Sequence, residues 1–128
     1  MTVKRIEGKT PDAPVPAGPY SQSVRIGDLI SCSGQAGISP DGRVVEGIEA
    51  QTKQAFANIA AALAAVGSSL DEVAHVRVYL TELEQFSAMN GIYESVFDAP
   101  YPARTTVYVT LPPGLLVEID AVAVSPAR

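Results

Sequence analysis

The chain of 128 residues has the length of one ordinary domain, and with 47% apolar and 18% charged residues it is unusually poor in charge. Nine basic and fourteen acidic residues give a net charge of −5, and the basic ones form no run longer than the pair Lys4-Arg5, which argues against nucleic acid or an anionic membrane as the main partner. So few charges on a small domain also favour association between subunits.

The first third of the chain predicts short strands and turns. Thr10–Pro19 contains four prolines and is expected to be an extended lead-in. Ser23–Ile26 and Leu29–Ser33 flank a Gly-Asp pair, a pattern typical of a β-hairpin with a tight turn. Ser39–Gly42 predicts a second turn, followed by a short strand at Arg43–Val45.

Between Glu49 and Val66 the apolar period changes to that of a helix, and Gly67 is well placed to end it. Gln51 and Asn58 fall mostly off the apolar stripe, and Val73–Leu80 then alternates as a strand does. The stripe consists of Ala55, Ile59, Ala62, Leu63 and Val66.

Thr81 and Glu84 fit a capping box at the start of a second helix, which must end before the prolines at 100 and 102. Thr105–Thr110 and Leu116–Val124 predict two final strands. The order of elements favours an α/β (α+β) fold in one domain, residues 1–128, with one mixed β-sheet and two helices packed on one face. Six positions lie on one side of the second helix: Leu83, Phe86, Met89, Asn90, Tyr93 and Phe97.

The last strand has two faces of different character. One face is purely apolar, and the other carries Glu118 and Asp120 together with Val122 and Val124. Since helices cover only one side of such a sheet, we expect the half-apolar open face to meet other subunits, with its charges lining a cleft at the rim.

The counts of cysteine and histidine argue against a disulfide and against a zinc site. Cys32 is the only cysteine and His75 the only histidine, so neither an intrachain disulfide nor a zinc cluster is expected. We expect Cys32 to pack in the interior, and His75 to lie on the surface or at an interface. Met1 to Gly8 carries mixed charge without an apolar segment, and no apolar run has the length of a membrane span, so we expect a cytoplasmic protein without membrane contact.

Four stretches carry polar groups where plain packing does not need them: Gly18–Gln22, Ser33–Gln35, Pro102–Thr106 and Leu116–Ile119. Each has a simpler interpretation when taken alone, respectively a turn, a strand end, a surface ion pair at Arg104 and a solvent-facing Glu118. Their combination is what suggests a binding site.

In order and spacing these stretches resemble the RidA family, also called YjgF, the reactive-intermediate deaminases. The resemblance extends from Gly18 to Ala123. The matching pieces are GPYSQSV, SGQ, EAQTKQAFANIAAAL, VGSSLDEV, VRVYLTELEQFSAMNGIYESVF, PARTTV and LPPGLLVEIDAVAV.

This resemblance implies a chorismate-mutase-like fold assembled as a homotrimer, with sheets inside, helices outside and three clefts between subunits. It also implies hydrolytic deamination of reactive 2-imino acids, such as 2-iminobutanoate and 2-iminopropanoate, to 2-keto acids and ammonia, with no cofactor and no metal. The expected partners are therefore a small 2-imino or 2-keto acid and further copies of the chain.

The resemblance assigns two catalytic positions. Arg104 matches the cleft arginine of the family, and a guanidinium binds a carboxylate through two parallel charge-assisted hydrogen bonds. Glu118 matches the glutamate that positions or deprotonates the attacking water.

Five further positions are expected to bind substrate. Tyr20 and Ser33 match residues that reach the cleft from the neighbouring subunit, and Gly34 allows backbone N–H groups to approach a ligand. Thr106 would contribute backbone contacts, and Asn90 is expected to have a supporting role.

The sequence departs from the family around the cleft. Thr106 replaces a cysteine found in many members, Tyr108 is unusually bulky, and both the 104–118 interval and the 97–102 loop are short. Three alternatives stay open: a related enzyme acting on another small carboxylate in a catabolic pathway, a non-catalytic metabolite-binding or regulatory trimer, and a ribonuclease or translation inhibitor. The acidic balance counts against the last.

Overall fold

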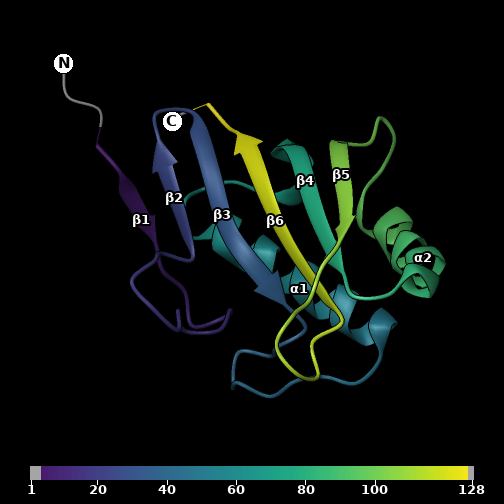
Figure 1. The fold of residues 1–128 in the computed structure, drawn as a ribbon. Helices are drawn as coiled ribbons and strands as arrows, with labels where there is room; N and C mark the ends of the chain where they lie inside the picture. Colours follow the sequence, from purple (N-terminus) through teal and green to yellow (C-terminus); the bar gives the residue numbers. More distant parts are fainter. Residues whose placement is uncertain (1–3, 127–128) are drawn as a thin grey trace.

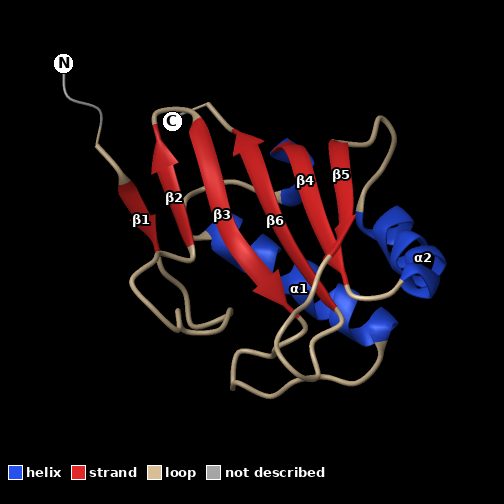
Figure 2. Ribbon diagram, viewed as in Figure 1, coloured by secondary structure: helices blue, strands red, loops and turns tan. Residues whose placement is uncertain are grey.

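The protein forms one six-stranded mixed sheet with both long helices on the same face (Figures 1 and 2). The computed structural model describes residues 4–126. The sheet order is β1-β2-β3-β6-β4-β5; β4 and β5 run parallel, and every other neighbouring pair is antiparallel. The strands are β1 (Ile6–Gly8), β2 (Ser23–Ile26), β3 (Leu29–Ala36), β4 (Val73–Leu80), β5 (Ala103–Tyr108) and β6 (Val117–Val124); the helices are α1 (Ile48–Ala64) and α2 (Phe86–Val96), with 3₁₀ turns at Leu70–Glu72 and Leu83–Gln85.

The last strand of the chain lies in the middle of the sheet. β6 pairs with β3 on one side and with β4 on the other, so its helix-facing residues enter the core and its other residues line the open face. This position explains the alternation of β6, in which Val117, Ile119, Ala121 and Ala123 are all buried. The prediction of one mixed sheet with two helices on one face is confirmed.

The apolar stripe of α1 is buried as predicted, but the two polar positions beside it are buried as well. Gln51 and Asn58 are 1% and 0% exposed, although their spacing predicted the opposite. The Gln51 amide donates to the carbonyls of Val45 and Gly114 and accepts from the N–H of Leu116. The Asn58 amide donates to the carbonyls of Ala36 at the end of β3 and of Ile38 just after it, and accepts from the Gln54 amide. Both side chains therefore satisfy backbone groups at strand ends and in loops that the sheet leaves without partners.

Substitution of Gln51 tests this role. Gln51→Leu keeps the volume and the helix propensity but leaves three backbone groups without partners, so we expect the free energy of unfolding to fall by about 3 kcal/mol. Urea denaturation followed by circular dichroism measures it. Lys53→Leu on the exposed side of the same helix is the matched control and is expected to change stability by less than about 0.5 kcal/mol. An equal loss in both variants would contradict the role of the amide.

Several predicted boundaries differ from the structure. The strand predicted at Arg43–Val45 is a single bridge between Ile38 and Val44, and β1 was not predicted because three residues are too few to show a period. The capping box joins Glu82 and Gln85, one residue later than Thr81 and Glu84, because a 3₁₀ turn precedes α2. The side-chain oxygen Oε1 of Gln85 accepts from the backbone N–H of Glu82 at 3.0 Å.

The edge strand β5 runs from Ala103 to Tyr108 rather than from Thr105 to Thr110. Its pairing with β4 starts at Ala103 beside His75 and ends at Tyr108 beside Leu80. Arg104 is therefore a strand residue with a fixed orientation, which matters for the site described next.

Candidate functional site

Arg104 lies on the helix-covered face at the free edge of the sheet. Its register partner on β4 is Val76, which is fully buried under the helices. The guanidinium donates from Nη1 to the Asn90 side-chain oxygen at 2.8 Å and lies over the Tyr93 ring, 4.7 Å from its centre. Phe86 lies on the same group at 5.6 Å. Three residues of α2 therefore orient the guanidinium.

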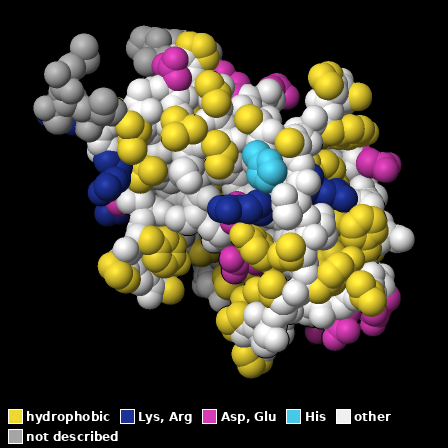
Figure 3. Space-filling view, turned by 45° about the horizontal axis from the view of Figure 1, so that its top comes forward, with side chains coloured by type: hydrophobic (Ala, Val, Ile, Leu, Met, Phe, Trp, Pro, Cys, Tyr) yellow, Lys and Arg dark blue, Asp and Glu magenta, His cyan; other side chains and the backbone are white. Residues whose placement is uncertain are grey.

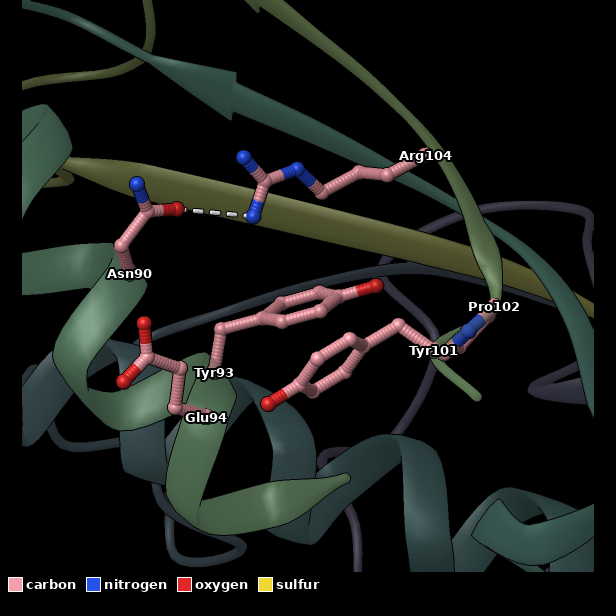
Figure 4. A pocket seen from close by; sticks show the side chains of 6 residues that line it. All are labelled: Asn90, Tyr93, Glu94, Tyr101, Pro102 and Arg104. Carbon is pink, nitrogen blue, oxygen red and sulfur yellow. Dashed lines mark hydrogen bonds between the residues drawn. The ribbon is translucent and has the colours of Figure 1, made fainter. Parts of the chain in front are cut away.

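The guanidinium opens into a hollow of about 280 Å³ (Figure 4). The hollow is lined by Asn90, Tyr93, Glu94, Tyr101, Pro102 and Arg104. Arg104 forms no ion pair with any of the residues 4–126, in contrast to Arg77, which pairs with Asp120. A guanidinium carries five N–H donors, so most of those of Arg104 are available to an anionic ligand. The simpler interpretation of Arg104 as half of a surface ion pair does not hold.

Glu118 lies on the opposite, open face of the sheet. It stands beside Tyr79 on β4 and Ala36 on β3, and its carboxyl group lies directly over Gly34. A Cβ atom at position 34 would be 2.5 Å from Glu118 Oε2. A side chain at position 34 would therefore displace the Glu118 carboxyl group from this position.

The hollow around Glu118 has a volume of about 290 Å³, and its walls are mostly apolar. Burial raises the pKa of the Glu118 carboxyl group, and the nearby Asp120 raises it further. A carboxyl group whose pKa moves towards neutrality is suited to accept and return a proton. The lining residues are Pro14, Val15, Ala17, Tyr20, Gly34, Gln35, Ala36, Ile38, Pro112, Leu115 and Glu118.

Tyr20 and Ser33 belong to the same side of the molecule as Glu118. Tyr20 is half exposed, and its hydroxyl oxygen accepts from the backbone N–H of Ala17 at 3.1 Å. The Ser33 hydroxyl donates to the carbonyl of Ser21 at 2.6 Å and thereby joins β3 to the segment that carries Tyr20. Tyr20 lines the hollow, whereas Ser33 does not.

Gln22, one of the polar side chains of the Gly18–Gln22 stretch, was given no role of its own from the sequence; in the structure it fixes the lead-in that contributes Pro14 to this hollow. Its buried amide accepts from the N–H of Thr10 and donates to the carbonyls of Thr10, Ala13 and Pro14. The proline-rich lead-in has few N–H groups of its own for pairing, so one side chain fixes it against the sheet. The only sequence signal was the position of Gln22 inside the motif GPYSQSV.

The predicted site residues therefore fall into two groups on opposite faces of the sheet. Arg104 and Asn90 form the first group, and Glu118, Tyr20 and Gly34 form the second. β4 separates their strands, so a small ligand bound to one chain does not contact both groups. Thr106 follows Arg104 on the helix side but lines neither hollow, and its buried hydroxyl has no hydrogen-bond partner among the described residues.

Cys32 and His75 lie outside both hollows. Cys32 is buried, as predicted, and its pKa is raised to about 12 by burial, so it carries no thiolate at neutral pH. Across residues 4–126 no group of three or more His, Cys, Asp or Glu side chains could hold a metal ion, and no helix there has the length and apolar character needed to cross a membrane.

Gly34→Ala tests the contact between Gly34 and Glu118. The added methyl group must displace the carboxyl group, so we expect any turnover that depends on Glu118 to fall at least about tenfold. The accompanying strain is expected to lower the free energy of unfolding by about 1–3 kcal/mol, which thermal denaturation measures. Gly91→Ala, where a Cβ meets nothing within 4 Å, is the control and should leave turnover unchanged. Unchanged turnover in Gly34→Ala would contradict the importance of the contact.

Comparison with known proteins gives concordant matches over nearly the whole chain. Residues 10–125 match the family model described as endoribonuclease L-PSP. A RutC family protein of Aquifex aeolicus is 44% identical over 122 residues, which cover 92% of this chain and 98% of the relative. A protein of Dermatophagoides farinae named 2-iminobutanoate/2-iminopropanoate deaminase is 38% identical over 127 residues, covering 97% and 98%.

Two solved structures share the fold. RidA from an Antarctic Psychrobacter species superimposes with a TM-score of 0.87 at 40% identity, covering 91% of this chain and 96% of that one. E. coli TdcF with bound serine superimposes with a TM-score of 0.89 at 34% identity, covering 94% and 98%.

Proposed function

Because the chain belongs to the endoribonuclease L-PSP family, also called the RidA/YjgF family, we propose that it hydrolyses reactive 2-imino acids to 2-keto acids and ammonia. The reaction takes place in clefts between the subunits of a homotrimer. The observation that carries this proposal is Arg104, an oriented guanidinium that opens into a hollow without a carboxylate partner among the described residues. A half-buried, oriented cation of this kind is suited to a small carboxylate.

The chemistry requires only orientation and one activated water. Arg104 binds the carboxylate of the imino acid through paired N–H groups. Glu118 accepts a proton from water as its oxygen attacks the imine carbon, and it passes this proton to the nitrogen to give the carbinolamine. Glu118 then takes the proton of the carbinolamine hydroxyl group and delivers it to the nitrogen as the carbinolamine collapses. The C–N bond breaks, ammonia leaves and the carbonyl of the 2-keto acid forms. Positioning and general acid–base help of about 10² to 10⁴ suit a reaction that proceeds unaided in water.

The separation of the two groups favours a composite site. Since Arg104 and Glu118 lie on opposite faces of one sheet, the cleft requires Arg104 of one subunit and Glu118 of its neighbour, with Tyr20 and Gly34 accompanying Glu118. The open face supports association, because it carries exposed apolar side chains beside its charges (Figure 3). They include Ile26, Leu29, Val107 and Val124.

Two names among the relatives agree with this chemistry. The Dermatophagoides farinae protein is named for imine deamination, and TdcF was solved with serine, which bears a carboxylate.

The alternative functions have less support. The net charge of the chain does not favour a ribonuclease, since it has nine basic and fourteen acidic residues. A purely binding role does not require Glu118 beside the anion. A related reaction on another small carboxylate would use the same two groups. The cytoplasmic location expected from the sequence is part of the same proposal.

Clearance of a freshly generated imine tests the function. An amino-acid oxidase or threonine dehydratase supplies the imine, and semicarbazide traps what survives. We expect the protein to reduce the trapped fraction and to speed keto-acid formation. An unchanged trapped fraction for several 2-imino acids would exclude general imine deamination and direct the search to other carboxylates.

A further inference from the structure

A second carboxylate, Asp120, stands two residues after Glu118 on the same open face of β6. Its Oδ1 accepts from Arg77 Nε at 2.8 Å, and its Oδ2 accepts from the Tyr79 hydroxyl at 2.9 Å. Arg77 is the register partner of Asp120, and Tyr79 is the register partner of Glu118. Tyr79 therefore reaches from a position beside Glu118 to the carboxylate of Asp120.

The two carboxyl groups have different environments. Both oxygens of Asp120 accept a hydrogen bond, one of them from a cation. Glu118 is half-buried over Gly34 beside an apolar hollow, with no recorded hydrogen bond to its carboxyl group among the described residues. Of two neighbouring carboxyl groups, the one without hydrogen-bond partners is the candidate for proton exchange.

We propose that Arg77, Asp120 and Tyr79 form a positioning cluster that sets the pH at which Glu118 works as a base. The fixed negative charge of Asp120 disfavours a second negative charge on Glu118, and Arg77 partly offsets that effect. The inference rests on the proposed function, because that function gives Glu118 its role. None of the three residues lines either hollow, so each acts through Glu118 rather than on the substrate.

The charged and titratable groups that face Glu118 are few. β6 contributes Asp120, β4 contributes Arg77 and Tyr79 with His75 farther along, and the lead-in contributes Tyr20. β3 contributes none, since its residues near Glu118 are Ser33, Gly34 and Gln35. The pKa of Glu118 is raised first by burial and then by Asp120, and the pKa of Tyr79 is raised by burial and by its bond to Asp120. The Arg77 side chain is 56% exposed, so salt screens its part of the cluster.

Two substitutions on this cluster are expected to act in opposite directions. Asp120→Asn removes the negative charge, so the titration midpoint of Glu118 moves to lower pH. Arg77→Gln leaves Asp120 uncompensated, so the midpoint moves to higher pH. Carbon-13 NMR of the carboxyl groups measures both directly, with the Glu118 signal identified by its loss in Glu118→Gln. Asp71→Asn, a surface carboxylate outside the cluster, is the control and should leave the midpoint unchanged.

The acid limb of kcat/KM for imine hydrolysis should move with the NMR midpoint in each variant. Opposite shifts support the inference; absence of a shift in both variants, or shifts in the same direction, overturns it. Since Arg77 is exposed, Arg77→Gln keeps the test decisive even where Asp120→Asn folds poorly. The midpoint is measured without substrate, so shifts without any imine turnover would refute the proposed function alone. Turnover with an unmoved midpoint would refute only the role of the cluster.

Discussion

Arg104→Ala is expected to lower kcat/KM for 2-imino acids by about a thousandfold. Removing a charged group that pairs with a buried substrate carboxylate costs about 2–5 kcal/mol, and a thousandfold loss corresponds to about 4 kcal/mol. The carboxylate is bound before and during the reaction, so we expect much of the loss to appear as a higher KM. Steady-state kinetics with enzymatically generated imines measure it.

Arg104→Lys separates charge from geometry. Lysine keeps the positive charge but lacks the planar pair of donors and the flat surface that stacks on Tyr93. We expect it to recover less than about a tenth of the lost kcat/KM. Arg43→Ala, which removes a guanidinium on an exposed loop, is the matched control and should leave the kinetics unchanged. Full activity in Arg104→Lys would show that a point charge suffices and would remove the argument for a carboxylate held by two bonds.

The elements around these residues were predictable because they depend on local patterns. The alternation of β4 and β6 and the stripe of α1 follow from residue spacing, and their buried faces agree with it. Gln51 and Asn58 were misassigned for the opposite reason. Their partners lie up to 65 residues away in loops, and spacing along one helix carries no information about such partners. Whether such an amide is buried depends on which backbone groups of the loops need a hydrogen-bond partner.

The candidate residues could be named from the sequence, but their grouping could not. Arg104 and Glu118 are fourteen positions apart in the chain, yet β6 returns to the middle of the sheet while β5 forms its edge. The register then turns Arg104 towards the helices and Glu118 away from them. Asp120 illustrates the same limit, since its partners on β4 lie 41 and 43 residues away. Sheet order decides which side chains meet, and it is a property of the whole chain.

Glu118→Gln is expected to lower kcat by about 10² to 10⁴, the usual contribution of a general base. Glutamine keeps the shape over Gly34 but accepts no proton at neutral pH, so KM should change little and the acid limb of the pH profile should disappear. Arg104→Ala and Glu118→Gln are then two nearly inactive proteins with different defects. Their combination tests whether one cleft draws on two subunits.

Subunits of the two variants carry different tags and are produced together, and assemblies of the proposed homotrimer that contain both tags are isolated. If each cleft joins Arg104 of one subunit to Glu118 of the next, a cleft is intact when the glutamine variant supplies Arg104 and the alanine variant supplies Glu118. In a closed ring of three, every mixed trimer has one intact cleft out of three, so about a third of the wild-type activity should return. Arg104→Ala mixed with the double variant provides no intact cleft and is the control. If both groups acted within one chain, every subunit in either mixture would lack one of them, and no activity would return.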